Sequence, residues 1–106
     1  MSMADRLRQA REAAGLSQGQ VAKKLEMHRP TISEIEAGRR KVSAEEVGQF
    51  AEIYGVALKW IISGPTENEP NDVRVLVAAR ELSKMSEADL ERLMKTLQMI
   101  RKPENP

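Results

Sequence analysis

The stretch that decides the fold is residues 17–38, Ser17-Gln-Gly-Gln-Val-Ala-Lys-Lys-Leu-Glu-Met-His-Arg-Pro-Thr-Ile-Ser-Glu-Ile-Glu-Ala-Gly38. Its pattern predicts two short helices joined by a turn over residues 26–29. Ser17 is suited to capping the first helix, because Gln20 stands at the third helical position and completes a capping box. Gly38 is suited to ending the second helix, since glycine readily adopts the left-handed conformation that follows many helices.

Each of these two helices has a single apolar face, made by Val21, Ala22 and Leu25 in the first and by Ile32 and Ile35 in the second. Helices this short are not stable alone in water, so the rest of the chain must support them. A short helix that is held on a scaffold and begins with polar residues fits the major groove of DNA. DNA binding is therefore the hypothesis against which the other residues are tested.

The distribution of charge is more informative than its total. The chain has 106 residues, enough for one domain with a short appendage, and a formal net charge of +1. Residues 1–41 hold nine Lys or Arg against five Asp or Glu, whereas the acidic residues are in excess over residues 42–64 and over residues 65–106. Positive charge is thus concentrated around the two-helix stretch, as a surface that binds a polyanion requires.

Several classes of protein are disfavoured by the composition. The chain has no cysteine and a single histidine, His28, so we expect no disulfide, no metal site and no cofactor. No apolar run approaches the roughly 18 residues of a membrane-spanning helix, and the first residues lack the apolar core of a signal peptide. There is no Ser/His/Asp set and no glycine-rich phosphate loop. We expect a cytoplasmic protein that is not an enzyme.

The scaffold around the two-helix stretch is also predicted to be helical, which gives an all-α fold. We expect helices over residues 3–14, 44–54 and 58–63, the first two capped by Ser2 and Ser43. Apolar residues recur at core-facing helical spacing in the second of these, and aromatic and branched residues fill the third: Val47, Phe50, Ala51 and Tyr54, then Trp60, Ile61 and Ile62. Residues 1–64 would form one DNA-binding domain.

One charged residue falls on an otherwise apolar face of the first helix. Arg11 shares that face with Leu7, Ala10 and Ala14. Its aliphatic stem could lie on the core with the guanidinium in water. Alternatively, the guanidinium pairs with a carboxylate on another helix. Helical periodicity alone leaves both interpretations open.

The C-terminal part of the chain is predicted to be a linker followed by two helices. Residues 65–71 are polar and contain two prolines, which is typical of a linker. Asp72 would cap a helix over residues 73–84, with apolar contacts from Val75, Leu76, Ala79 and Leu82. A last helix over residues 87–101, preceded by Ser86, has a clear apolar stripe made by Leu90, Leu93, Met94, Leu97 and Ile100. We treat residues 72–102 as a dimerisation segment.

The apolar stripe of the last helix requires a partner that buries it. It could fold back onto its own domain, or it could pair with a second copy of the chain. We favour the second interpretation, because the linker separates the stripe from the N-terminal core and symmetric pairing is common in dimers. Binding to a membrane surface is disfavoured, since the polar face of this helix carries both acidic and basic residues.

The loop after Gly38 and the turn before Pro30 offer contacts to the DNA backbone. Arg39, Arg40 and Lys41 directly follow the proposed reading helix, which favours phosphate contacts over a merely solvated loop. His28 lies in the turn. It is either a backbone contact or an exposed residue of the turn without a function.

These residues resemble the phage-repressor/Cro (XRE-type) helix-turn-helix family. The resemblance covers about residues 3–64 and is carried by Leu16-Ser-Gln-Gly-Gln-Val-Ala-Lys-Lys-Leu25, Ile32-Ser-Glu-Ile-Glu-Ala-Gly38 and Tyr54-Gly-Val-Ala-Leu-Lys-Trp-Ile-Ile-Ser-Gly64. It implies a five-helix DNA-binding domain, used mostly in dimeric transcriptional repressors. The helices over residues 72–101 are then a C-terminal extension.

The resemblance also implies roles for single residues. Gln18 would contact the DNA backbone and brace the first reading residue, and Arg11 would pair with Glu36. The positions that face base edges are those of Arg29, Thr31 and Glu34. Pro30 departs from the family pattern and disfavours helical geometry at the residue before it, so we expect Arg29 to cap the helix.

An acid near phosphates is costly unless it contacts a base or a neighbouring cation. For Glu34, Arg29 or Lys41 could be that cation.

We therefore expect a sequence-specific regulator that binds double-stranded DNA, in the form of a homodimeric repressor on a near-palindromic operator. The alternative is an antitoxin or adaptor whose C-terminal helices bind a partner protein, with DNA binding used for autoregulation.

Overall fold

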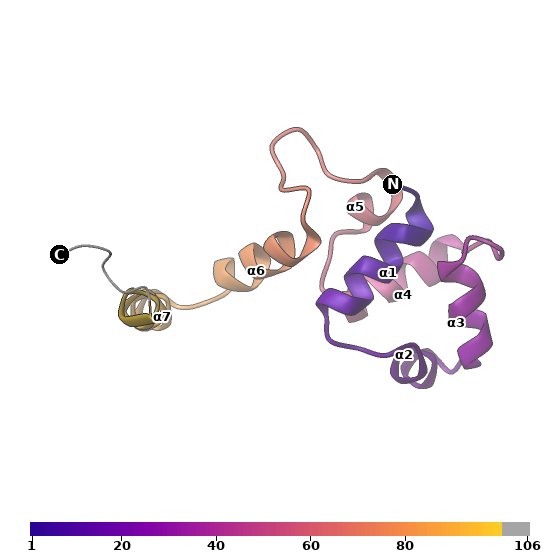
Figure 1. Ribbon diagram of the computed structural model, residues 1–106, viewed down its shortest axis with the longest axis horizontal. Coiled ribbons are helices and arrows are strands. Elements are labelled where there is room, and N and C mark those ends of the chain that lie inside the picture. Colours follow the sequence, from indigo (N-terminus) through magenta and orange to yellow (C-terminus); the bar gives the residue numbers. More distant parts are fainter. Residues whose placement is uncertain (101–106) are drawn as a thin grey trace.

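The computed structural model describes residues 1–100, and every regular element in that range is an α-helix. Figure 1 shows the arrangement of these elements: α1 (Met3–Ala13), α2 (Gln18–Leu25), α3 (Arg29–Glu36), α4 (Ala44–Tyr54), α5 (Leu58–Ser63), α6 (Val73–Ser83) and α7 (Glu87–Ile100). The first five helices gather into one body, and α6 and α7 extend from it. The predicted all-α fold is confirmed.

Three helices begin with the capping boxes expected from the sequence. Each box joins a serine to a side chain three residues on, and both hydrogen bonds of the box are present at Ser2–Asp5, Ser17–Gln20 and Ser43–Glu46. Each box satisfies backbone N–H groups that have no partner within the helix. The boundaries of α1, α2 and α4 are therefore set by local sequence.

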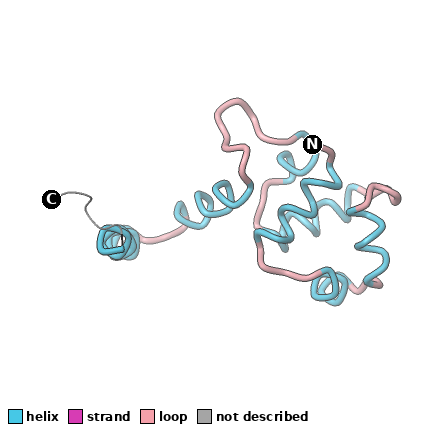
Figure 2. Tube along the Cα trace, in the orientation of Figure 1, coloured by secondary structure: helices cyan, strands magenta, loops and turns pink. Residues whose placement is uncertain are grey.

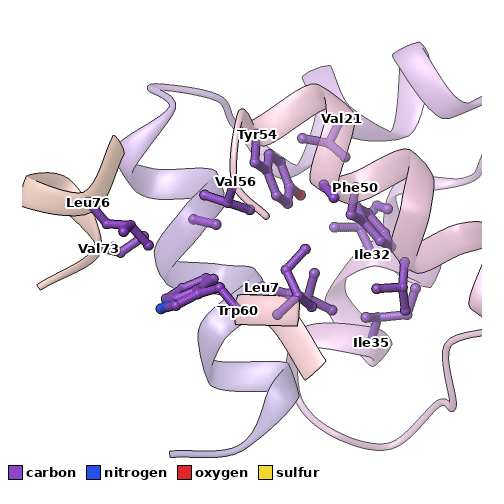
Figure 3. Packing of buried hydrophobic residues seen from close by; sticks show 14 of the residues in the cluster. Leu7, Val21, Ile32, Ile35, Phe50, Tyr54, Val56, Trp60, Val73 and Leu76 are labelled. Carbon is purple, nitrogen blue, oxygen red and sulfur yellow. The ribbon is translucent and has the colours of Figure 1, made fainter. Parts of the chain in front are cut away.

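The core lies between α1, α2, α3, α4 and α5, where Figure 3 shows the buried side chains converging. Leu7, Phe50 and Trp60 are among its largest fully buried members. The rings of Phe50 and Tyr54 stack with centroids 5.7 Å apart. In α5, Trp60 and Ile61 are buried, whereas Ile62 is 53% exposed. A single short helix presents only one face to the core, and Trp60 and Ile61 occupy that face.

A buried arginine, Arg6, was not identified from the sequence. It is only 7% exposed, and its guanidinium donates hydrogen bonds to the carbonyl oxygens of Ile61 and Ile62, both at 2.8 Å, and to that of Met1. The carbonyls of Ile61 and Ile62 belong to the last turn of α5, where they have no partner within the helix. Arg6 therefore caps α5 from α1.

The sixth helix is attached to the core rather than separated from it. The expected cap is present, because the Asp72 carboxylate accepts a hydrogen bond from the Arg74 N–H at 2.9 Å. The helix α6 packs against α1 through Val73 and Leu76, which join the core cluster (Figure 3).

The predicted contact face of α6 was only partly right. Leu76 is buried as expected, but Val75, Ala79 and Leu82 are exposed. The buried face is instead made by Val73 and Leu76, with Val77 partly buried beside them. The start of the helix faces α1 because the loop before it returns there, and this return sets which side of the helix is inward (Figure 1).

The seventh helix lies away from the body, joined to α6 by a short turn, as the tube in Figure 2 shows. None of its residues from 87 to 100 is buried. The alternative in which the apolar stripe folds back onto its own domain is therefore not found. The predicted last helix included residue 101 and the dimerisation segment included residues 101 and 102, and these two residues lie outside the described residues. That residues 72–102 form a separate functional unit stays a prediction.

The role of Arg6 can be tested by Arg6→Met, which keeps the length of the side chain and removes its donors. We expect the free energy of unfolding to fall by about 2–3 kcal/mol, because hydrogen bonds from a charged donor are lost at a buried site. The control is Arg8→Met on the same helix. Arg8 is exposed and makes only surface ion pairs, so its loss should cost about 0–1 kcal/mol. Equal effects of the two substitutions in urea unfolding would contradict the capping role.

Candidate nucleic-acid interface

The turn between α2 and α3 is short and begins with a residue in the left-handed conformation. Glu26 ends α2 at φ 56°, and His28 precedes α3 in an extended conformation. The expectation that Arg29 caps α3 was wrong, since Arg29 is its first residue. The Thr31 N–H donates to the His28 carbonyl oxygen at 2.9 Å, which closes the first turn around Arg29. Pro30 fits in that turn because an N–H there has no partner within the helix.

The outward side of α3 carries most of the residues predicted to read bases. Ile32 and Ile35 point into the core, so the opposite side of the helix faces solvent. Arg29 is exposed, whereas Thr31 and Glu34 are partly buried. A shallow hollow at this surface is lined by Gln18, Arg29, Pro30, Ser33 and Glu34.

The hollow joins the start of α2 to the first turns of α3. It brings Arg29 and Glu34 together with Gln18, while Thr31 is not among its lining residues. Ser33 was not identified from the sequence as a residue of this surface. Its position one helical turn after Arg29 was the available signal, because residues four apart share a helix face.

A buried hydrogen-bond network fixes the position of α3. Arg11 binds the Glu36 carboxylate with two hydrogen bonds, from Nε at 2.7 Å and from Nη2 at 3.0 Å. The side chains are 13% and 4% exposed respectively. Gln18 Nε2 donates to the same carboxylate at 3.1 Å. The start of α2, the end of α1 and the end of α3 are thereby tied at one point.

This network settles the alternatives for Arg11, because its guanidinium is paired rather than directed into water. The hydrogen bond to Glu36 raises the pKa of Arg11 further above its ordinary value. Arg11 Nη1 also donates to the Leu16 carbonyl oxygen at 2.9 Å, within the loop that leads into α2. Gln18, expected to contact the DNA backbone, is partly committed to this interior contact.

Two of the three basic residues after Gly38 are paired within the chain. Arg39 Nε lies 2.7 Å from Glu34 Oε2, and Arg40 makes two hydrogen bonds of 3.1 Å with the Glu46 carboxylate. Lys41 is exposed. The cation that accompanies Glu34 is therefore Arg39, and the expectation of Arg29 or Lys41 in that role was wrong.

The two ion pairs of this loop keep their carboxylates ionised. The Arg39 hydrogen bond lowers the pKa of Glu34 below its ordinary value, and the Arg40 hydrogen bond does the same for Glu46. His28 is exposed, and its side chain makes no capping hydrogen bond to α3. In the range 1–100, Arg29 makes no ion pair with a carboxylate, which leaves its guanidinium available to a ligand.

No group of three His, Asp or Glu side chains within residues 1–100 is arranged to hold a metal ion. Over those residues there is also no helix with the length and apolar character needed to span a membrane.

Comparison with known protein families identifies the family to which the α2–turn–α3 unit belongs. Residues 2–59, more than half of the chain, match the model of the helix-turn-helix domain. The chain belongs to this helix-turn-helix family. Membership in this family supports binding of double-stranded DNA and a role as a DNA-binding regulator. No curated protein matches the chain. In this helix-turn-helix protein the matched residues run from the cap of α1 into α5.

Loss of one partner of the buried pair should destabilise the domain. We expect Glu36→Ala to lower the free energy of unfolding by about 3 kcal/mol, because Arg11 is left largely buried without its counter-charge. The double variant Arg11→Met with Glu36→Leu should recover part of this loss, since it removes both charges and restores apolar volume. Thermal unfolding of the three proteins provides the measurement. A double variant less stable than Glu36→Ala would contradict this account.

Proposed function

We propose that this chain is a sequence-specific transcription regulator of the phage-repressor/Cro (XRE) type, which acts as a homodimeric repressor on a near-palindromic operator. The observation that carries the proposal is the outward side of α3. There the exposed Arg29, which makes no ion pair within residues 1–100, lines a shallow hollow, and the basic loop of residues 39–41 follows the same helix. Positive charge thus lies at both ends of the helix that would enter the major groove.

Base recognition would come from the first turns of α3. Arg29 presents a planar guanidinium suited to the two acceptors on the major-groove edge of guanine. Thr31 would contact a thymine methyl group or donate a hydrogen bond, and Glu34 would accept from the amino group of a cytosine. Ser33, at the hollow, is a further donor that could contact a neighbouring base or phosphate.

Phosphate contacts would set the pose of the domain. Backbone N–H groups at the starts of α2 and α3 would donate to phosphates, together with Gln18 and His28 at those starts and Lys41 in the loop after α3. Arg39 and Arg40 would have to exchange their carboxylates for phosphates. Such an exchange is feasible, because surface ion pairs are weak and are screened by salt.

Dimerisation is supported by the size of the unit and by the exposed stripe of α7. One small domain reads only a few base pairs, and two recognition helices about 34 Å apart fit successive turns of the groove on one face of DNA. The stripe available for pairing is made by Leu90, Leu93, Met94, Leu97 and Ile100, of which Ile100 is 70% exposed. A homodimer with two-fold symmetry implies an operator with the same symmetry, and occupation of that operator would block access by other proteins.

The antitoxin or adaptor alternative uses the same α7 surface for a different protein. Co-purification distinguishes the two. A homodimer that binds its selected operator without any other protein supports the repressor, whereas a second protein held in fixed ratio by residues 72–100 supports the alternative.

Arg29 is the residue whose loss should change DNA recognition most. A preferred sequence is first selected from a random duplex pool. Arg29→Ala should then weaken binding to it by about 1–3 kcal/mol, the value of a good contact to one base, and should weaken binding to an unrelated duplex less. Arg74→Ala is the control. Arg74 is an exposed arginine on α6, so this substitution removes the same positive charge away from the proposed DNA-binding surface. Fluorescence anisotropy at fixed salt gives both affinities, and an equal loss on both duplexes would mean that Arg29 only contacts phosphate.

Glu34 should affect which sequence is preferred more than how tightly DNA is bound. We expect Glu34→Ala to relax the preference at one base pair in a selection experiment. It also frees Arg39, which should raise affinity modestly for every duplex. The double variant with Arg39→Ala removes the second effect, so any change of preference that remains belongs to Glu34. A uniform gain in affinity with an unchanged selected sequence would show that Glu34 reads no base.

A further inference from the structure

The feature that the DNA-binding surface does not account for is the face of α7. Within residues 87–100 none of its side chains is buried, although Leu90 and Leu93 are partly covered. Leu97 is 48% exposed and Ile100 is 70% exposed. Consecutive apolar residues at helical spacing form one continuous surface. On α6, the exposed Val75 and Leu82 add apolar surface before the turn into α7.

The four Leu and Ile residues of this stripe are spaced symmetrically along the helix. Leu90 and Leu93 are separated by three residues, as are Leu97 and Ile100, so the pattern is the same read in either direction about Lys95. If two such helices run antiparallel with a two-fold axis beside Lys95, Leu90 lies opposite Ile100 of the second copy. Leu93 then lies opposite Leu97 of that copy, so these four apolar positions meet one another, while Met94 lies opposite Thr96. Lys95 itself points away, because it is on the opposite side of the helix from the stripe.

The charges of α7 favour the same orientation. Its acidic residues, Glu87, Asp89 and Glu91, all precede its basic residues, Arg92 and Lys95. In a parallel pair, each carboxylate would lie beside the equivalent carboxylate of the second helix. The two helix N-termini, which both carry partial positive charge, would also lie side by side. In the antiparallel pair the two acidic ends are about 20 Å apart, given a rise of 1.5 Å per residue. At physiological salt, charges that far apart are screened, since the Debye length is about 8 Å.

We infer that α7 pairs antiparallel with α7 of a second copy of this chain, with the two-fold axis beside Lys95. The inference rests on the proposed homodimer and adds its orientation and register. A pair of helices of this length alone buries less than the roughly 800 Å² per partner of a stable interface. The exposed Val75 and Leu82 of α6 would supply further apolar area. Because the two α7 helices begin at opposite ends of the pair, the DNA-binding domains leave it in opposite directions and can reach separate half-sites.

The chain has no cysteine, so disulfide cross-linking can report the orientation directly. Leu90→Cys and Ile100→Cys are prepared separately, one of them with a tag that changes its mass. The antiparallel pair predicts a disulfide between the two variants when they are mixed under mild oxidation. It predicts no disulfide in a homodimer of either variant alone. In such a homodimer the two equivalent cysteines lie about 15 Å apart along the helix axis, beyond the reach of a disulfide. Self-cross-linking of Leu90→Cys without a mixed product would establish a parallel pair and overturn the inference.

A second variant separates pairing from folding. Leu93→Lys should weaken self-association at least tenfold in analytical ultracentrifugation, while Lys95→Ala, on the opposite face, should leave it unchanged. Thermal unfolding of the DNA-binding domain should be the same in both, because no residue of α7 from 87 to 100 is buried in the monomer. A monomeric wild-type chain would overturn the inference.

DNA binding by the wild-type chain is measured alongside these experiments. Sequence-specific binding with parallel or absent pairing would contradict the inference while leaving DNA recognition intact. Antiparallel pairing without any DNA binding would contradict the proposed function instead.

Discussion

The two hydrogen bonds between Arg11 and Glu36 hold together the part of the molecule on which DNA recognition depends. The helices α2 and α3 have eight residues each, too few to be stable in isolation. Their apolar faces pack on the core, but packing alone allows small rotations of a short helix. A charged and directional contact at the end of α3, joined by Gln18 from the start of α2, restricts those rotations. The outward surface of α3 is therefore presented in a defined orientation.

The helix α1 serves as the common support for the rest of the chain. Near the start of α1, Arg6 donates hydrogen bonds to carbonyl oxygens at the end of α5. Nearer the end of α1, Arg11 binds Glu36 and so holds α3. The helix α6 packs on α1 as well, through Val73 and Leu76. Because α6 is seated in this way, the exposed helix α7 leaves the body from a defined point. A pair of α7 helices would thus connect two DNA-binding domains through elements that are each anchored to α1.

In the loop after α3, only one of the three consecutive basic residues is without a carboxylate partner among residues 1–100. Arg39 and Arg40 are each held by a carboxylate, Glu34 and Glu46, whereas Arg29 and Lys41 form no ion pair within residues 1–100. The paired arginines contribute less to the field felt by an approaching phosphate than their number implies. The pairs also restrain the loop, and weak surface pairs of this kind can be exchanged for phosphates at small cost.

Local sequence by itself determined the helices, their caps and most of the core. Ser2, Ser17 and Ser43 each satisfy backbone donors within three residues, and helical periodicity marks the buried side of α4, so neither depends on distant residues. The partners of charged side chains were decided only in the tertiary structure. Arg6 meets carbonyls 55 and 56 residues away, and the inward face of α6 depends on where the preceding loop returns. Periodicity identifies a side of a helix, but the group that meets it is fixed by packing between segments far apart in the chain.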